Sequence, residues 1–324
     1  MDKMTSIRLE RYTPDMAGRW DEFVSASRNA TFLTLRRYMD YHADRFADHS
    51  LVAMKNGSIV ALLPANEIRR DDGAMILQSH GGLTYGGWIL PPRHVDAADV
   101  LTLFNLLREY SLDNGIRGID YKPLPYIYAA MPSDDDRYAL FRQGARLTEC
   151  NISATIDLSD NPGFNTLQRR NMKKALKAGV EIVADADIAA FHALLSRCLA
   201  ERHGVSPVHT SAELEMLRNR FPERIRAFMA VGDGEALAGV CMFYTGRVAH
   251  AQYICSSGAG REKGALTLLF DYIIGKETEG CRYFDFGICN ERHGEYLNEG
   301  LYRQKSGLGG SGVAYERYYL DFAD

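Results

Sequence analysis

"LTLLFDYIIGKETEGCRYFDF", residues 266–286, aligns without a gap on "LTLFNLLREYSLDNGIRGIDY", residues 101–121. The two stretches share an initial Leu-Thr-Leu and, further on, a glycine, an arginine and an aspartate at matching positions. Each predicts a helix that closes near the glycine and a short strand that ends in the aspartate. The chain therefore contains the same helix–strand pattern twice.

The flanking segments repeat in the same order. Upstream, residues 50–68 and 226–245 each predict two strands joined by a tight turn, Asn-Gly in the first and Asp-Gly in the second. Downstream, "FRQG" (141–144) matches "YRQK" (302–305), and a strand-like run follows each. The order hairpin, helix, strand, helix, strand predicts an α/β (α+β) fold in which helices cover a mixed sheet.

Turn-forming residues in "DLSDNPGFN", residues 157–165, mark the expected boundary between the halves. We therefore predict two closely packed domains, 1–158 and 159–324. The sequence leaves open which of the two sheets receives the C-terminal strand.

The bulk composition narrows the class of protein. A net charge of −4 and a pI near 6.2 give no general argument for binding DNA. Without an apolar run of about 18 residues we expect no membrane insertion, and "MDKMTSIRLERY" lacks the apolar core of a signal peptide. The six cysteines form no CxxC pair and no metal-ligand spacing. We expect a cytoplasmic protein with reduced thiols and no metal site.

Three stretches, in this order, resemble the FemAB-like branch of the GNAT-like acyl-CoA N-acyltransferase superfamily. "TFLTLRRYMDYHADRF" (31–46) resembles its aromatic-rich N-terminal helix, and "LQRRNMKKALKAGVEI" (167–182) resembles its basic helix. "YFDFG…GLYRQKSGLGG" (283–310) resembles its closing signature. The resemblance implies two tandem GNAT-like domains, each a mixed twisted sheet flanked by helices.

The resemblance also implies where the acyl donor binds. The strand "VAHAQYICSS" (248–257) would offer backbone N–H groups to the donor carbonyl, so Tyr253, Ile254 and Cys255 are candidate donor contacts. Arg261 and Gly264 are the nearest match to the loop that holds the CoA pyrophosphate, at the start of the next helix. The match departs at its last position, Leu266, which leaves acyl-CoA and aminoacyl-tRNA both open as donors.

The stretch 284–310 supplies the candidate catalytic residues. In a GNAT-like layout Tyr302 would protonate the leaving group, and Lys305 would neutralise the developing oxyanion or hold a phosphate. Asp285, at the end of its strand, would accept the amine proton or bind the ammonium. Structural alternatives stand beside each: Tyr302 as a core residue, Lys305 as a solvated helix-end lysine and Asp285 as a cap.

The internal repeat provides a comparison for these assignments. Phe141 stands opposite Tyr302, and Gly144 stands opposite Lys305, so the first half lacks both the phenol and the ammonium. We therefore expect one active site, in the second half, with the first half as scaffold and substrate wall.

Other residues are candidates for binding the substrate. Residues 161–179 contain no acid, and the basic face with Arg169 and Lys173 would hold phosphates or form a solvated surface. Tyr85, in the glycine-rich "HGGLTYGGW" (80–88), would stack on substrate, unless the segment is a simple hairpin. Asn290 and Arg303 complete the candidate set.

The sequence thus predicts an N-acyltransferase that moves an acyl group from a CoA-type thioester to a primary amine by direct attack. The acceptor would be a small-molecule or peptide amine, and acetyl-CoA or another acyl-CoA the co-substrate. A FemAB-type aminoacyltransferase that uses aminoacyl-tRNA on a peptidoglycan precursor is the first alternative. A non-catalytic ligand-binding protein is the second.

Overall fold

The computed structural model describes residues 7–323, so residues 1–6, half of the stretch that predicts the absence of a signal peptide, lie outside it. The chain divides into two compact units. Unit 1 comprises the chain up to Asn151, His293–Glu295 and the end of the chain from Ala314. Unit 2 comprises Ile152–Arg292 and Tyr296–Val313.

Unit 1 contains two groups of strands and four α-helices among its described residues. Its strands are β1 (Ile7–Arg11), β2 (Leu51–Lys55), β3 (Ser58–Leu63), β4 (Asn66–Arg69), β5 (Met75–Ser79) and β6 (Ile116–Tyr121). Its helices are α1 (Ala17–Ala26), α2 (Arg36–Met39), α3 (Ala97–Asp113) and α4 (Asp135–Arg142). Two long strands, β7 (Arg146–Asp157) and β15 (Ser311–Asp321), carry the chain from one unit to the other.

Unit 2 repeats the order of elements. Its further strands are β8 (Glu181–Val183), β9 (Ile225–Gly232), β10 (Glu235–Tyr244), β11 (Val248–Ser256), β12 (Tyr283–Ile288), β13 (Asn290–Glu291) and β14 (Tyr296–Leu297). Its helices are α5 (Thr166–Lys177), α6 (Ile188–His203), α7 (Ser211–Arg220), α8 (Gly258–Lys263), α9 (Ala265–Lys276) and α10 (Glu299–Gly307).

The sheet of each unit mixes parallel and antiparallel neighbours. In unit 1, β1-β2-β3 form one sheet, and β4, β5, β6 and β15 follow one another in a second. In unit 2 the order is β7-β12-β11-β10-β9-β8. Each unit contains a parallel pair with a helix between its strands: β5 and β6 flank α3, and β11 and β12 flank α9. The C-terminal strand, which the sequence left unassigned, pairs with β6.

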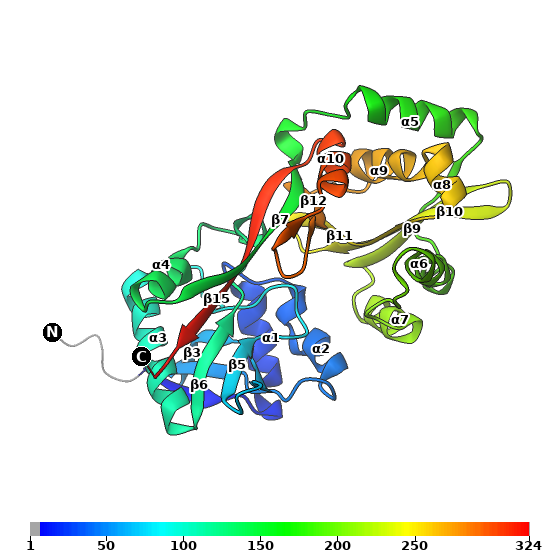
Figure 1. Ribbon diagram of the computed structural model, residues 1–324. Helices are drawn as coiled ribbons and strands as arrows, with labels where there is room; N and C mark the ends of the chain where they lie inside the picture. The colour runs from blue at the N-terminus through cyan, green and yellow to red at the C-terminus, as the bar shows by residue number, and fades with distance from the viewer. Residues whose placement is uncertain (1–6, 324) are drawn as a thin grey trace. The chain divides into compact units, whose positions relative to one another are not determined.

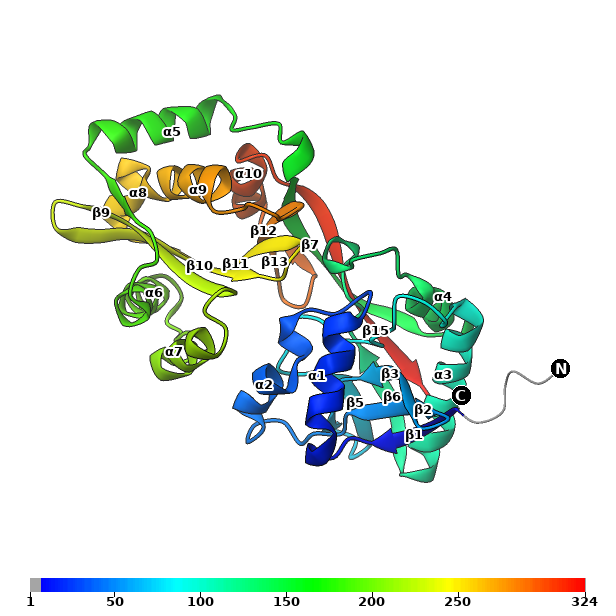
Figure 2. The ribbon, with the colours of Figure 1, turned by 180° about the vertical axis from the view of Figure 1, so that it is seen from behind.

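Helices cover both faces of the unit 2 sheet (Figure 1). Helices α6 and α7 lie on one face, whereas α8, α9 and α10 lie on the other and α5 packs on the outside of α9. The view from behind shows the same layering (Figure 2). Between sheet and α9, the rings of Phe270, Phe284 and Phe286 meet edge to face with centroids 4.8–6.0 Å apart. This apolar layer holds the parallel pair and its helix in place.

The predicted tight turns are confirmed. Asn56 and Gly57 have φ values of 51° and 79°, and Asp233 and Gly234 have 52° and 78°. Both central residues of each turn are thus left-handed, as a two-residue hairpin with native strand twist requires. Short-range turn chemistry was sufficient to predict these two hairpins.

Two local predictions in unit 1 are wrong. The segment 31–46 is not one helix: Leu35 is extended, and α2 spans only four residues between 3-10 turns. Tertiary contacts explain the break, because the Arg36 guanidinium lies over the rings of Tyr12 and Trp20 and pairs with Asp48. The segment 80–88 is not a hairpin but a packed loop. A Cβ on its Gly86 would lie 2.0 Å from the carbonyl oxygen of Ser79.

Candidate functional site

The parallel strands of unit 2 separate after a short pairing. Strand β11 registers with β12 at Val248↔Tyr283, Ala249↔Phe284 and His250↔Asp285. It then continues for six more residues, to Ser256, paired with β10 on its other side. The separation opens a V between the end of β11 and the end of β12.

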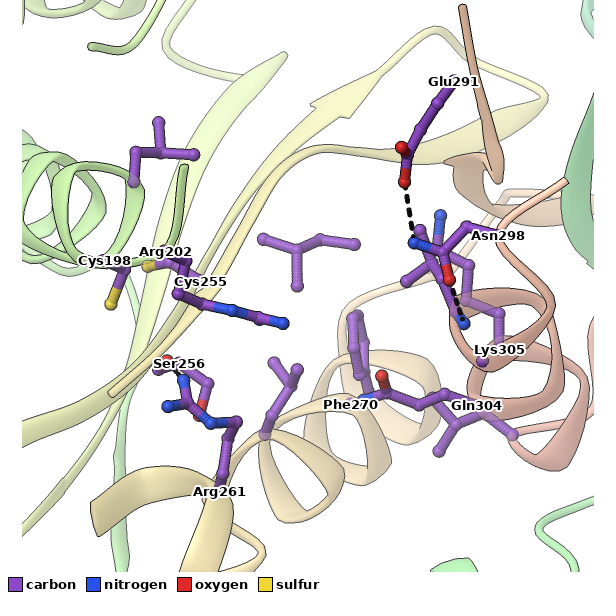
Figure 3. A pocket seen from close by; sticks show the side chains of 16 residues that line it. Cys198, Arg202, Cys255, Ser256, Arg261, Phe270, Glu291, Asn298, Gln304 and Lys305 are labelled. Carbon is purple, nitrogen blue, oxygen red and sulfur yellow. Dashed lines mark hydrogen bonds between the residues drawn. The ribbon is translucent and has the colours of Figure 1, made fainter. Parts of the chain in front are cut away.

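A cavity of about 530 Å³ occupies this part of unit 2. That volume lies within the usual range of about 300–1,000 Å³ for small-molecule sites. Cys198, Arg202, Cys255, Ser256 and Arg261 lie on one side, and the other side is formed by α9, α10 and the β13 segment (Figure 3). The described lining residues are Cys198, Leu199, Arg202, Ile254, Cys255, Ser256, Arg261, Leu266, Phe270, Glu291, Asn298, Gly300, Leu301, Gln304, Lys305 and Leu308.

Lys305 is a buried cation on the cavity wall. Its side chain is only 6% exposed, and its Nζ donates to the carbonyl oxygens of Gly287 and Ile288 at 2.8 and 3.0 Å. Burial lowers the pKa of this ammonium, and the nearby Cys289 and Asp285 oppose that shift. The two carbonyl contacts fix the ammonium where β12 turns away from β11. Lys305 is therefore not the solvated helix-end lysine of the structural alternative.

The charges around the cavity favour an anionic ligand. Arg202, Arg261 and Lys305 line it together with one acid, Glu291. The Arg261 guanidinium is oriented by the carbonyl oxygen of Ser256, which accepts from Nη1 at 2.7 Å. Glu291 accepts from the Asn298 amide at 2.9 Å, and Asn298 in turn caps α10. Guanidinium groups next to an apolar interior suit a phosphorylated ligand with an uncharged arm.

Two thiols lie in contact on the opposite wall. Cys198 from α6 and Cys255 from β11 are both 5% exposed, and the Cys255 thiol donates to the carbonyl oxygen of Gly239 at 3.6 Å. The contact with Cys255, together with the nearby Arg197 and Arg261, lowers the pKa of Cys198 against the effect of burial. The pKa of Cys255 is raised by the same contact and by burial. All six cysteines are free thiols.

Asp285 lies at the centre of a buried polar cluster at the apex of the V. It is fully buried and accepts hydrogen bonds from the hydroxyls of Ser153 and Thr155, the latter at 2.9 Å. Its other oxygen lies 2.8 Å from Nδ1 of His250. The backbone N–H of Gly287 donates at 3.3 Å to Oδ1 of Asp285, the oxygen that also accepts from the two hydroxyls. Such a cluster holds a carboxylate in a single orientation.

Four of the residues predicted from the sequence share this cavity: Ile254, Cys255, Arg261 and Lys305. Tyr302 is not among its lining residues. It lies half-buried on α10, one position after Leu301, and its ring packs on the core. Helical periodicity explains this, because positions 301, 304, 305 and 308 share the face toward the cavity and 302 is turned about 100° away.

Helix α5 packs against Gly264 at the start of α9, where the sequence predicted the pyrophosphate site. Gly264 has φ of 75°, and a Cβ there would lie 2.5 Å from the carbonyl oxygen of Asn171 in α5. Glycine is therefore required by helix packing at this position. Tyr253 is held by His209, whose Nδ1 contacts its hydroxyl, and it is not a lining residue of the cavity.

The remaining predicted residues lie outside the cavity. Arg169 and Lys173 are exposed on α5, and Arg303 is exposed on α10, where it pairs with Glu299 at 2.5 Å. Asn290 accepts from the backbone N–H of Ile152 at 2.6 Å. Tyr85 belongs to unit 1 and is 2% exposed, with its hydroxyl 3.1 Å from that of Thr31, so its ring is enclosed by protein.

The sequence analysis missed His250, Cys198, Arg202 and Gln304. Cys198 and Arg202 come from α6, which ends at His203, well before β11 begins at Val248, and no motif connects them to it. His250 was part of the predicted strand, and its alternation with the apolar Ala249 and Ala251 was the available signal. Gln304 lies one residue before Lys305 and could have been found by helical spacing from Leu301.

The described part of the chain has neither a cluster suited to a metal ion nor a helix suited to a bilayer. Residues 7–323 contain no group of three or more His, Cys, Asp or Glu side chains placed to hold a metal ion. Among the helices of the same range, none combines the length and the apolar character needed to cross a bilayer.

Comparison with known families identifies the domain that contains this cavity. Residues 166–295 match the family model of the acetyltransferase (GNAT) domain. A search of curated protein sequences found no match. The matched range includes β11, β12 and α9, the elements that form the V and its crossover helix.

Solved structures share the fold over nearly the whole chain. FemX superimposes with a TM-score of 0.70 at 12% identity, covering 97% of both chains. The C-terminal domain of a putative lysylphosphatidylglycerol synthetase from Agrobacterium fabrum gives 0.60 at 15%, covering 95% of this chain and 91% of that one. A tandem GNAT protein from the clavulanic acid biosynthesis pathway gives 0.53 at 14%, covering 98% and 99%.

The family match and the shared fold define the class of protein. Residues 166–295 match an acetyltransferase (GNAT) domain, and the chain as a whole shares its fold with FemX and with a tandem GNAT protein. The resemblance drawn from the sequence and the predicted fold class are thereby confirmed.

Proposed function

We propose that the protein transfers an acyl group from a CoA-type thioester to a primary amine and that the cavity of unit 2 binds the donor. The observation that carries this proposal is the V between β11 and β12, with an apolar interior and cations at its wall. The acyl-pantetheine arm would lie along β11 past Ile254 and Cys255. Arg202 and Arg261 would bind the phosphates.

The chemistry follows from this placement. The neutral amine attacks the thioester carbonyl, an N–C bond forms, the C–S bond breaks and the thiolate leaves. Backbone N–H groups of β11 beyond His250 and the Lys305 ammonium are the candidate groups to stabilise the negative charge on the carbonyl oxygen. Because Lys305 is fixed by two carbonyl groups, it needs no rearrangement when that charge develops.

A second donor, aminoacyl-tRNA, is favoured by the outer surface of α5. Its five cations are exposed, and within the part of the chain that the structure describes none of them has an ion-pair partner: Arg169, Arg170, Lys173, Lys174 and Lys177. Unneutralised cations along one helix suit a polyphosphate backbone. One structural neighbour is named as a lysylphosphatidylglycerol synthetase, which by its name makes an aminoacylated product.

The donor can be decided by ligand stabilisation. Acetyl-CoA at 100 times its Kd should raise the free energy of unfolding by about 2.7 kcal/mol, measured by thermal shift. Arg261→Gln should raise the Kd of acetyl-CoA at least fivefold and so reduce this stabilisation. Arg142→Gln, which changes an exposed arginine of unit 1, should leave the Kd unchanged. Stabilisation by aminoacyl-tRNA but not by acetyl-CoA would replace the first donor by the second.

The second donor has its own variant. Arg170→Glu combined with Lys174→Glu reverses two charges on α5 and changes none of the residues that line the cavity. This variant should abolish aminoacyl-tRNA binding if α5 holds the acceptor stem, and it should leave acetyl-CoA binding intact.

A further inference from the structure

The parallel strand pairs of the two units carry the same aspartate but give it different partners. Asp120 on β6 registers with Gln78 on β5, and Asp285 on β12 registers with His250 on β11. In unit 1 the Gln78 amide donates to Oδ2 of Asp120 at 2.9 Å. In unit 2, Nδ1 of His250 lies 2.8 Å from Oδ2 of Asp285. At equivalent places in the two sheets, an amide that cannot titrate corresponds to an imidazole that can.

The two carboxylates also differ in the charge of the groups that contact their other oxygen. In unit 1 the Arg317 guanidinium lies 2.8 Å from Oδ1 of Asp120, so a permanent cation balances that carboxylate. In unit 2, hydroxyls from β7, those of Ser153 and Thr155, take the corresponding place on Asp285. Hydroxyl donors neutralise a carboxylate less than a contacting guanidinium does, so Asp285 keeps more of its negative charge for its imidazole partner than Asp120 would.

The position of His250 connects the pair to the cavity. His250↔Asp285 is the last registered pair before β11 and β12 separate. A Cβ on Gly287 would lie 3.6 Å from Cε1 of the imidazole, and the carbonyl oxygen of that same glycine binds Lys305 Nζ at 2.8 Å. His250 and the cavity-lining ammonium therefore flank one residue of β12. The ring lies where β11 and β12 separate; it is not itself a lining residue of the cavity, and Gly287 lies between it and the lining ammonium.

Among the described residues, titratable groups on β12, on α10 and just beyond β12 lie near this imidazole. Asp285 on β12 contacts it directly, and the Lys305 ammonium on α10 lies close enough to Asp285 to interact with it electrostatically. Cys289, beyond the end of β12, faces Lys305. In the tautomer in which Nδ1 donates to the Asp285 carboxylate, the lone pair of neutral His250 is on Nε2.

We propose that His250, oriented by Asp285, is the base that takes the proton from the acceptor amine. The inference rests on the proposed acyl transfer. As the amine nitrogen bonds to the acyl carbon and the C–S bond breaks, the ammonium proton passes to Nε2, directly or through one water. The leaving thiolate is then protonated from solvent, and His250 returns its proton there. Asp285 keeps its negative charge throughout and is a positioning residue, not the proton acceptor.

The test replaces the His250–Asp285 pair of unit 2 by a Gln–Asp pair like that of unit 1. His250→Gln reproduces the Gln78–Asp120 arrangement and should lower kcat by about 100-fold, as expected for the loss of a general base. The Kd of the donor should stay within twofold. The acidic limb of the pH–rate profile should disappear, which a purely structural role of the imidazole would not cause. Gln78→His in unit 1 is the matched control and should leave the pH–rate profile unchanged.

A second variant guards against misfolding. His250→Ala should be inactive and should regain at least tenfold in rate with added imidazole, whereas Gln78→Ala should not respond. Wild-type kcat and pH profile in His250→Gln, with donor binding intact, would overturn the assignment of the base and leave the acyl-transfer proposal standing. A wild-type protein that neither binds nor turns over acyl-CoA or aminoacyl-tRNA would overturn both.

Discussion

The parallel strand pair of unit 1 is closed, and that of unit 2 is open. Strands β5 and β6 stay paired up to their last residues, Ser79 and Tyr121. Beyond them the backbone N–H of Lys122 donates to Ser79 Oγ, and that of Gly86 donates to the Lys122 carbonyl, both at 2.9 Å. Strands β11 and β12 separate after three pairs, and a cavity lies there instead. The two units thus have a similar order of elements, but only in unit 2 do the parallel strands separate and leave a cavity. The difference arises at the ends of the strands.

The largest effect should come from Lys305, whose matched position in unit 1 is Gly144. Lys305→Met keeps the length of the side chain but removes the donor to Gly287 and Ile288, and we expect kcat/KM to fall by at least about 100-fold. The exposed Lys276→Met on α9 is the control, and circular dichroism checks the fold. A rate within threefold of wild type would make Lys305 a structural residue only.

Next in size is the acid sensitivity of unit 1, which tests whether its closed pair depends on a neutral histidine. Burial, followed by the nearby His42, lowers the pKa of His80 to about 3 from an ordinary 6.5. The unfolded chain therefore binds the proton first, and the stabilisation present above pH 6.5 is lost as pH falls toward 3. Between pH 6.5 and 5 this amounts to about 2 kcal/mol, measurable by urea unfolding.

A variant separates this histidine from other groups. Burial raises the pKa of Asp136 to about 6, so protonation of that carboxyl relieves a penalty as pH falls and acts in the opposite direction. His80→Gln should flatten the acid loss, whereas His293→Gln, an exposed histidine, should not. The same slope in His80→Gln and wild type would assign the acid sensitivity elsewhere.

A smaller effect should appear in thiol reactivity, which reports directly on the open pair. Cys198 and Cys255 line the cavity, whereas Cys150 is exposed and belongs to unit 1. Saturating acyl-CoA should slow alkylation of the two cavity thiols at pH 8 by about tenfold and leave Cys150 unaffected, as followed by peptide mass spectrometry. Equal rates with and without donor would place the donor outside the V.

The smallest effect concerns the phenol that the sequence singled out. Tyr302→Phe should lower kcat/KM at least tenfold if the hydroxyl protonates the leaving group. Its position off the cavity wall favours a loss below threefold, and we expect that result. Phe141→Tyr in unit 1, where the ring is 77% exposed, should change neither rate nor stability measurably. A tenfold loss in Tyr302→Phe would restore the predicted general acid.

The sequence comparison succeeded where the signals were local. Asn56-Gly57 and Asp233-Gly234 demand left-handed backbone and so predict two hairpins without reference to the rest of the chain. The helix–strand repeat placed α3–β6 and α9–β12 correctly because apolar periodicity reports which face is buried. It failed at residues 31–46, because the contacts of Arg36 with Tyr12, Trp20 and Asp48 determine the backbone there.

From the amino-acid order alone came the succession of elements, the family resemblance and four residues of the cavity wall: Ile254, Cys255, Arg261 and Lys305. Only the tertiary structure decided that His250 meets Asp285, that α6 brings Cys198 and Arg202 to β11, and that Tyr302 faces away from the cavity. The reason is physical. Turns and helices depend on neighbours a few residues apart, whereas the register at which two strands part depends on packing between residues such as Ser153 and Asp285, 132 positions apart in the chain.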